Sequence, residues 1–213
     1  QALLDMLQLN AGAISRAEAS LDWTFNSGSE DFNYLASGES LTLTYNINVA
    51  DDQNATDISS VVITINGTND GIQLANADTA ITSGSISELV DGSNNELTAS
   101  LSSSGFFSLT DLDFSDSNAV SITSSSSTST QLSTGQATLG TLSPYVHTPT
   151  TDGATGRVEW TYSVNDSAVD YLAENQTITE SFTIKVDDGN GSSISQVVNV
   201  TITGKNDAPS ISI

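Results

Sequence analysis

The sequence predicts an all-β protein made of antiparallel β-sandwich repeats in tandem. One observation behind this prediction is an internal duplication, and a second is the period-two alternation of apolar residues within each copy. A third is that clusters of glycine, asparagine, aspartate and serine separate these runs, while no helical periodicity is sustained. Together the three observations favour sandwiches of the immunoglobulin-like class.

The duplication aligns residues 23–70 with residues 160–207 without a gap. Of the 48 aligned positions 15 are identical, including a tryptophan at the start and Gly-x-Asn-Asp at the end of each copy. A repeat with a fixed period is one structural unit. We therefore predict that residues 1–70 are the C-terminal part of a first, truncated or split repeat, and that residues 71–213 are a complete repeat with its downstream linker.

Each copy contains two predicted strands joined by a turn. The alternating apolar runs cover residues 41–49 and 61–65 in the first copy, and residues 178–186 and 198–202 in the second. The intervening turns read Asp-Asp-Gln-Asn and Asp-Asp-Gly-Asn-Gly, which is typical of hairpins. We expect Trp23 and Trp160 to lie in the two cores, facing these strands.

Three segments outside the alternating runs are less regular. The leucine-rich stretch 3–9 is predicted as a strand, with a helix as the alternative. The Ser/Thr run 124–130 is predicted as a solvated loop, as is the segment that carries His147 between Pro144 and Pro149.

The first copy has no counterpart of residues 78–137 in this sequence. Three explanations stay open: the boundary of the expressed polypeptide, proteolysis, or a domain that is split by an inserted module. An open half-sandwich exposes strand edges, which favour pairing with another chain. Strand exchange between two copies would give a dimer, but we expect a monomer.

Composition excludes several classes of function. The chain has 26 acidic residues against 4 basic ones, a formal charge of −22, so no basic surface is available for nucleic acid. It has no cysteine, which excludes disulfides and thiolate zinc sites and fits a secreted bacterial protein. No apolar run is long enough to insert into a membrane. With His147 as the single histidine, we expect no enzymatic activity.

Acidic residues gather in the predicted connections between strands. Self-repulsion of this size destabilises a compact fold unless an external cation compensates, and hard divalent cations suit oxygen ligands. Alternating Asp-x-Asp places two carboxylates on one side of an extended loop. The candidate ligands from this pattern are Asn69, Asp70, Glu88, Asp111, Asp113, Asp116, Asp187, Asp188, Asn206 and Asp207.

The strings LASGESLT and LAENQTIT, VADD and VDDGNG, and TINGTND and TITGKNDAP resemble the VCBS repeats of large bacterial RTX-type surface adhesins. The resemblance covers residues 21–70 and 81–209, and it implies cadherin-like sandwiches that bind Ca²⁺ at each domain junction. At the internal junction it implies ligands from Asn69, Asp70, the loop of Asp111 and Asp113, the turn of Asp187 and Asp188, and Glu39. At the downstream junction it implies Asn206, Asp207, Glu88 and Glu174, of which Glu174 replaces the residue aligned with Glu39, Gln176.

The resemblance implies a mechanical function. We expect a calcium-rigidified extender segment of a secreted adhesin at the bacterial cell surface, which projects ligand-binding modules for cell adhesion and biofilm formation. Its partners would be neighbouring repeats of the same chain and an inserted or distal ligand-binding module. Two alternatives stay open: a module that binds a glycan or peptide through residues 105–107 or 144–147, and a split domain that hosts an inserted ligand-binding module.

Overall fold

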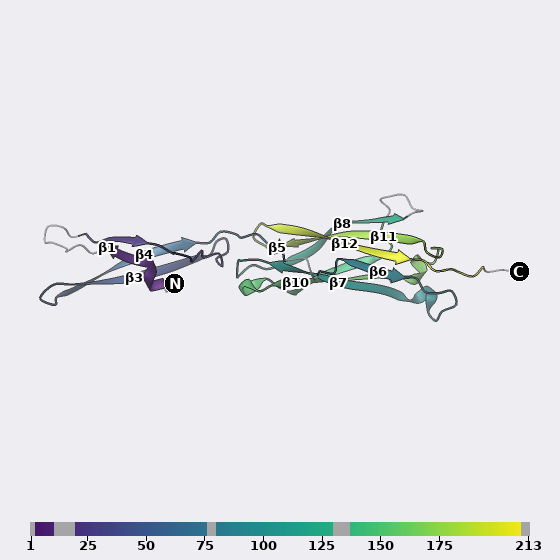
Figure 1. The fold of residues 1–213 in the computed structure, drawn as a ribbon, viewed down its shortest axis with the longest axis horizontal. Coiled ribbons are helices and arrows are strands. Elements are labelled where there is room, and N and C mark those ends of the chain that lie inside the picture. Colours follow the sequence, from purple (N-terminus) through teal and green to yellow (C-terminus); the bar gives the residue numbers. More distant parts are fainter. Residues whose placement is uncertain (1–2, 11–19, 76–79, 130–136, 210–213) are drawn as a thin grey trace. The chain divides into compact units, whose positions relative to one another are not determined.

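The computed structural model describes residues 3–10, 20–75, 80–129 and 137–209. The chain divides into two compact units, unit 1 over Gln1–Thr68 and unit 2 over Asn69–Ile213. Both units consist of strands with short 3-10 turns, and the described residues contain no α-helix, which confirms the predicted all-β class (Figure 1). Within these residues, no helix combines the length and the apolar character needed to cross a membrane.

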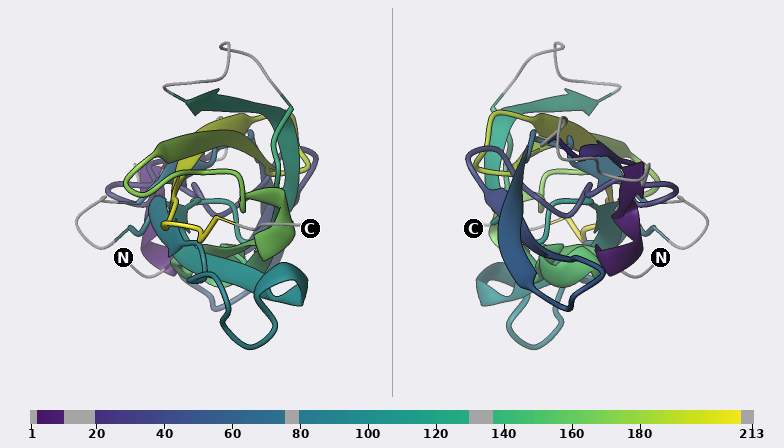
Figure 2. Two further views of the ribbon diagram at one scale, coloured as in Figure 1. Left: turned by 90° about the vertical axis from the view of Figure 1, so that its right-hand side faces the viewer. Right: turned by 90° about the vertical axis from the view of Figure 1, so that its left-hand side faces the viewer.

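Unit 2 is a sandwich of two four-stranded sheets, which lie as two layers in the end-on views of Figure 2. Its strands are β5 (Gln73–Leu74), β6 (Ser83–Ser87), β7 (Ser100–Thr110), β8 (Ala119–Ser129), β9 (Thr141–Thr148), β10 (Gly156–Asn165), β11 (Thr177–Asp187) and β12 (Ser193–Thr203). The sheet orders are β5-β7-β10-β9 and β6-β12-β11-β8. The entering chain contributes β5 to one sheet and β6 to the other, and the remaining strands follow the constant-type immunoglobulin order.

The core of unit 2 forms because successive residues of a strand point to opposite faces. Along β11 every second side chain is buried, from Ile178 to Val186. The indole of Trp160 on β10 is fully buried, and its Nε1 donates a hydrogen bond to the carbonyl of Ile81 at 2.8 Å. Burying an aromatic side chain of this size is among the largest contributions one residue makes to a core.

Two loop predictions for unit 2 are wrong. Ser124 to Ser129 belong to β8, an edge strand that pairs with β11 along its length, while Thr130 lies outside the described residues. Threonine favours strands, and an edge strand needs apolar residues on one face only. Pro144 and His147 lie in β9, the edge of the other sheet, where a residue without an N–H is tolerated.

Unit 1 consists of two hairpins. They contain η1 (Leu3–Met6), β1 (Leu7–Asn10), β2 (Asp22–Phe25), β3 (Ser40–Ala50) and β4 (Thr56–Asn66). β1 pairs with β2 and β3 pairs with β4, both antiparallel. The stretch 3–9 is thus a 3-10 turn followed by a strand, and Met6 in that turn is fully buried.

The prediction that Trp23 lies in a core is wrong, because its side chain is 41% exposed whereas that of Trp160 is 0% exposed. By the sequence alignment, β2, β3 and β4 correspond to β10, β11 and β12. Among the described residues of unit 1, nothing corresponds to β6, β7 and β8, the strands that complete the sandwich in unit 2.

Candidate metal centres

Three segments meet at one end of unit 2 and bring acidic side chains together. They are the stretch before β5, the loop between β7 and β8, and the hairpin between β11 and β12. We call the resulting group the entry cluster, and its members are Asn69, Asp70, Asp111, Asp113, Asp116 and Asp188.

Backbone hydrogen bonds fix the carboxylates of the entry cluster. Asp113 Oδ2 accepts a hydrogen bond from the backbone N–H of Asp70 at 2.8 Å, which ties the stretch before β5 to the β7–β8 loop. Asp188 Oδ1 accepts from the N–H groups of Asn190 at 2.8 Å and Ser192 at 3.0 Å, which closes the β11–β12 hairpin. Short side chains such as aspartate favour turns through bonds of this kind.

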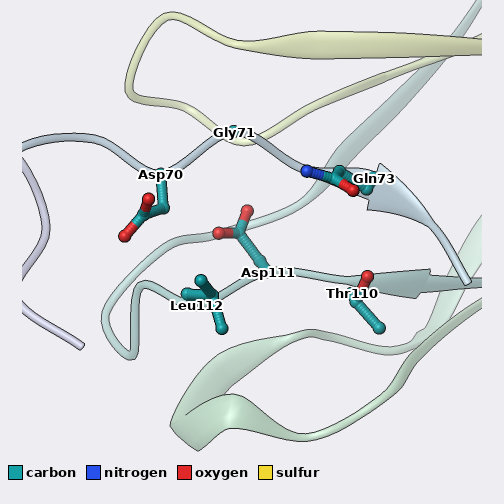
Figure 3. A pocket seen from close by; sticks show the side chains of 6 residues that line it. All are labelled: Asp70, Gly71, Gln73, Thr110, Asp111 and Leu112. Atoms are coloured by element: carbon teal, nitrogen blue, oxygen red, sulfur yellow. The ribbon is translucent and has the colours of Figure 1, made fainter. Parts of the chain in front are cut away.

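The oxygen atoms of the entry cluster converge. Asp111, Asp116 and Asp188 each place one carboxylate oxygen within 4.8 Å of the others, and all three side chains are buried. The amide Nδ2 of Asn69 donates to Asp188 Oδ2 at 3.3 Å. Figure 3 shows Asp70 and Asp111 beside a cavity of about 210 Å³, with the Asp111 carboxylate turned toward the stretch that carries Asp70 and Gly71.

Several buried oxygens of the entry cluster have no hydrogen-bond donor. They are Asn69 Oδ1, Asp111 Oδ2 and Asp113 Oδ1. In the described part of the chain, the ion pairs that form involve Glu159 or Asp187, neither of which belongs to the cluster. Burying a charge without a partner is costly. Converging carboxylate and amide oxygens are the ligand set that Ca²⁺ takes, so these residues fit such an ion.

Burial and mutual repulsion perturb the titration of these acids. Desolvation, with repulsion from Asp116, Asp113 and Asp188, raises the pKa of Asp111 from 3.8 to about 6. Desolvation is also the main cause that raises the pKa of Asp113. A carboxylate with a raised pKa gains from a nearby cation, because the cation favours its charged form.

A second acidic group lies where unit 2 ends. One oxygen each from Glu88, Asp170 and Asp207 lie within 4.8 Å of one another. Glu88 follows β6, Asp170 follows η5 (Asp166–Ala168), and Asp207 follows β12. We call these three residues, together with the fully buried Asp166, the exit cluster.

The exit cluster repeats the bonding of the entry cluster. Glu88 Oε2 accepts from the N–H of Lys205 at 2.7 Å, and Asp166 Oδ1 accepts from the N–H of Leu89 at 2.9 Å. Their second oxygens, Glu88 Oε1 and Asp166 Oδ2, are buried without a donor. Desolvation is the main cause that raises the pKa values of Glu88 and Asp170.

The two clusters lie at opposite ends of the sandwich. Asp188 precedes the 11-residue strand β12 and Asp207 follows it. A strand rises about 3.3 Å per residue, so about 35 Å separates the ends of β12. The entry cluster includes the dipeptide Asn69-Asp70, and the exit cluster includes Asp207 of the dipeptide Asn206-Asp207. In both dipeptides the asparagine Nδ2 donates to the backbone carbonyl of the following aspartate, at 3.2 and 3.3 Å.

Four of the candidate ligands have other surroundings. Asp187 accepts from Lys185 Nζ at 2.7 Å, which lowers its pKa. Glu174 and Asn206 are exposed. Glu39 lies in unit 1, where its Oε2 accepts from the N–H of Ala36 at 3.0 Å. The aligned Gln176 makes the equivalent bond to Ala173, so this contact needs no charge. That Glu39, Glu174, Asp187 and Asn206 bind Ca²⁺ stays a prediction.

Sequence reasoning missed Asp166, Asp170 and Asn190. Asn190 Nδ2 donates to Asp116 Oδ1, so this amide belongs to the shell of the entry cluster. Asp166 and Asp170 align with Ser29 and Asn33, so the duplication does not mark them as acidic positions. The signal in the sequence was the spacing of these two aspartates, four residues apart. In the structure this spacing places them on one turn, where the N–H of Asp170 donates to the carbonyl of Asp166.

Comparisons with known proteins leave the family open. No family model matches the chain, and no curated protein matches it. Its structure is similar to the cadherin-like domains 1 to 4 of zebrafish RET, with a TM-score of 0.41, 9% identity and 95% of this chain covered. For the first three domains of mouse protocadherin PcdhgC3 the values are 0.35, 16% and 93%. For CfaE, the adhesive subunit of the CFA/I fimbria of enterotoxigenic Escherichia coli, they are 0.40, 10% and 86%.

This chain spans 40%, 54% and 62% of those three structures. Scores this low carry no argument about function. The assignment of the fold therefore rests on the strand order of unit 2, and the resemblance to VCBS repeats stays a prediction.

Proposed function

We propose that unit 2 is a Ca²⁺-binding structural module of a large secreted bacterial adhesin, where it extends and stiffens the chain. The observation that carries the proposal is the set of buried, donor-free acid and amide oxygens at both ends of the sandwich. Two clusters at opposite ends suit a module whose connections on both sides are held by ions. The expected partners are neighbouring repeats of the same chain, and no catalytic role is proposed.

In the entry cluster, the ion would join three segments that are distant in sequence. Asn69 and Asp70 come from the entering chain, Asp111 to Asp116 from the β7–β8 loop, and Asp188 from the β11–β12 hairpin. Neutralising these carboxylates removes their mutual repulsion and fixes the entering chain against the sandwich. Extracellular Ca²⁺ modules typically bind at about 10⁻⁴ to 10⁻³ M, so millimolar Ca²⁺ would occupy a large share of such sites.

Thermal unfolding tests this proposal. We expect the melting temperature to rise in millimolar Ca²⁺ relative to EDTA, and to change little in Mg²⁺, which demands stricter octahedral geometry. At a free Ca²⁺ about 100 times the Kd, one site adds about 2.7 kcal/mol. The variant Asp113→Asn should lose the part of the rise that the entry cluster contributes, and Asp52→Asn, an exposed acid in the turn between β3 and β4, should keep the full rise. Equal melting temperatures of the wild type in Ca²⁺ and EDTA would contradict the proposal.

A second candidate function is the binding of a glycan or peptide on the outer face of β9 and β10. Tyr145 is 48% exposed there, its hydroxyl donates to Glu159, and the guanidinium of Arg157 stacks 3.8 Å from the ring of Phe106. An exposed aromatic ring is the surface on which a sugar stacks. Residues 105–107, expected to form a binding loop, lie instead in β7, where Phe107 is buried and unavailable. Saturable binding of a glycan that Tyr145→Ala abolishes would establish this function.

A further inference from the structure

Unit 1 presents an apolar face whose counterpart within unit 2 is buried. The side chains of this open face are Leu21, Trp23, Ile47, Val49 and Val61. They line a hollow of about 540 Å³ together with the polar residues Asp57, Ser59 and Ser60. Large exposed apolar patches on a protein mark sites of interaction.

The duplication supplies a matched comparison for this face. Trp23 is 41% exposed and Val49 is 39% exposed, whereas the aligned Trp160 and Val186 are both 0% exposed. Leu21, Ile47 and Val61 are half-buried, and the residues aligned with them in unit 2, Val158, Ile184 and Val198, are all 0% exposed. The aligned positions therefore carry apolar side chains in both copies, but other strands cover these side chains only in unit 2.

Unit 2 shows what covers such a face. A Cβ atom added at Gly105 would lie 2.5 Å from the Trp160 ring, and one added at Gly84 would lie 3.2 Å from it, so both glycines pack directly on the indole. The carbonyl of Ile81 accepts the indole N–H. Phe107, on the same strand as Gly105, is buried in the same core as Trp160. These contacts come from residues 81–107, which include β6 and most of β7.

The strand edges of unit 1 match this cover. In unit 2, β10 pairs with β7, β11 with β8, and β12 with β6. The aligned strands β2, β3 and β4 each pair with one strand among the described residues, so each has a second edge available. An exposed edge beside an apolar face is a template for an added strand.

We propose that the open face of unit 1 binds a β-stranded polypeptide segment of the type formed by residues 80–129, which completes the sandwich. This segment places a glycine-bearing strand on the indole of Trp23 and offers a backbone carbonyl to its N–H. Added strands pair with β2, β3 and β4. The site is specific because an ordinary side chain at the glycine position would collide with the ring.

A second copy of unit 1 does not supply this chemistry. Its four strands contain no glycine, so none of them can lie against an indole as the strand with Gly105 does. The segment must therefore carry a sequence pattern like that of β6 and β7, with glycine at the position facing the tryptophan and apolar residues at alternate positions beyond it.

A fusion protein tests the proposal. Residues 71–137 are duplicated and joined in front of Gln1 of the full chain, which reproduces the order of the complete repeat. Trp23 should then lose its quenching by acrylamide, and the amides of β2 and β4 should gain protection from hydrogen exchange. Trp160, already buried, serves as an internal reference. The matched control carries Gly105→Val in the duplicated copy alone, and its Trp23 should stay quenchable.

A synthetic peptide of residues 99–111 gives a second measurement should the fusion misfold. Added to the full chain, it should shift the emission of Trp23 to the blue, and the Trp23→Phe variant should show no shift. Trp23 that stays quenched in the folded fusion would overturn the proposal, as would a peptide that gives no shift when the fusion does not fold. Protection of Trp23 by concentration-dependent dimerisation of the unmodified chain would also overturn it, because the occupant would be a second copy. None of these results depends on Ca²⁺ binding by unit 2.

Discussion

Asp111 and Asp113 are acids that folding makes harder to ionise. In the absence of an ion, the raised pKa of Asp111, about 6, exceeds its unfolded value of 3.8. The folded state therefore binds protons more readily than the unfolded state between these values. The resulting stability is fully present below the unfolded pKa and is lost as the pH rises through the folded pKa.

The pH dependence of stability should therefore reverse with Ca²⁺. In EDTA, we expect the melting temperature to rise when the pH falls from about 7.5 to about 5. In Ca²⁺ the bound ion holds the carboxylates ionised, so protonation competes with binding and the melting temperature should fall over the same range. Melting curves of wild type and Asp111→Asn check this, and the variant should show a flatter profile in EDTA. Parallel profiles with and without Ca²⁺ would contradict the expectation.

Glu180 is a buried acid of a different kind, because its oxygens have donors. It is 0% exposed on β11, and it accepts from the hydroxyl of Tyr162 at 2.8 Å and from the N–H of Gly140 at 3.2 Å. The N–H of Leu139 also donates to it. The carboxylate therefore fixes the segment before β9 to the core. The aligned residue in unit 1 is Leu43, an apolar side chain that needs no such donors.

Removing one donor to Glu180 should measurably destabilise unit 2. We expect Tyr162→Phe to lower the free energy of unfolding by about 1.5 to 3 kcal/mol, the range for a hydrogen bond to a charged group. Tyr145→Phe is the matched control, because Tyr145 also donates to a glutamate but is 48% exposed. Urea denaturation of both variants measures the difference. Equal midpoints for the two variants would show that the buried contact contributes nothing.

At the scale of the strand, β7 depends on a glycine. A Cβ atom at Gly105 would lie 2.3 Å from the carbonyl oxygen of Ile81 and 2.5 Å from the ring of Trp160. We expect Gly105→Val to destabilise the fold by about 3 kcal/mol, at the upper end for overpacking of a core. Ser104→Val places the same side chain on the exposed side of the same strand and should change stability little. Thermal unfolding monitored by circular dichroism distinguishes the two.

Strands and turns could be predicted from the sequence because each of these elements depends mainly on its own residues. The alternation along β3, β4, β11 and β12 and the turns between them follow from local pattern, and the structure contains them. The exposure of Trp23 depends on strands that the alignment could not supply, so the pattern alone misplaced it. The strand β8 was missed because its serine-rich sequence pairs through the backbone, which composition does not reveal.

The entry cluster could be predicted from the sequence to a similar degree. Asp111, Asp113 and Asp188 stand in short loops with a recognisable acidic pattern, and the structure brings them together. Asp170 joins Glu88 only because the turn after β10 packs beside the end of β6, a tertiary arrangement. Which of two adjacent acids points inward is likewise a tertiary matter, since Asp187 faces Lys185 and Asp188 is buried.

For the whole molecule, the proposal predicts that Ca²⁺ narrows the range of conformations. Binding to the entry cluster fixes the stretch of Asn69 and Asp70 against two loops of unit 2. Small-angle X-ray scattering should show a smaller spread of dimensions in Ca²⁺ than in EDTA for the wild type. Asp113→Asn should give the EDTA profile in both conditions. A scattering profile that stays unchanged although the protein binds Ca²⁺ would contradict the predicted stiffening, and Ca²⁺ would then only stabilise the fold.

The parallel pairing of β6 with β12 determines how unit 2 would respond to a pulling force. Five residue pairs, from Ser83 with Asn199 to Ser87 with Thr203, join β6, which follows the short strand β5, to β12, the last strand of this unit. Tension applied through the two ends of unit 2 pulls these parallel strands in opposite directions along their length. Their hydrogen bonds are then sheared together rather than opened one by one, so the rate of forced unfolding should be low. Resistance to extension thus follows from strand direction, independently of any bound ion.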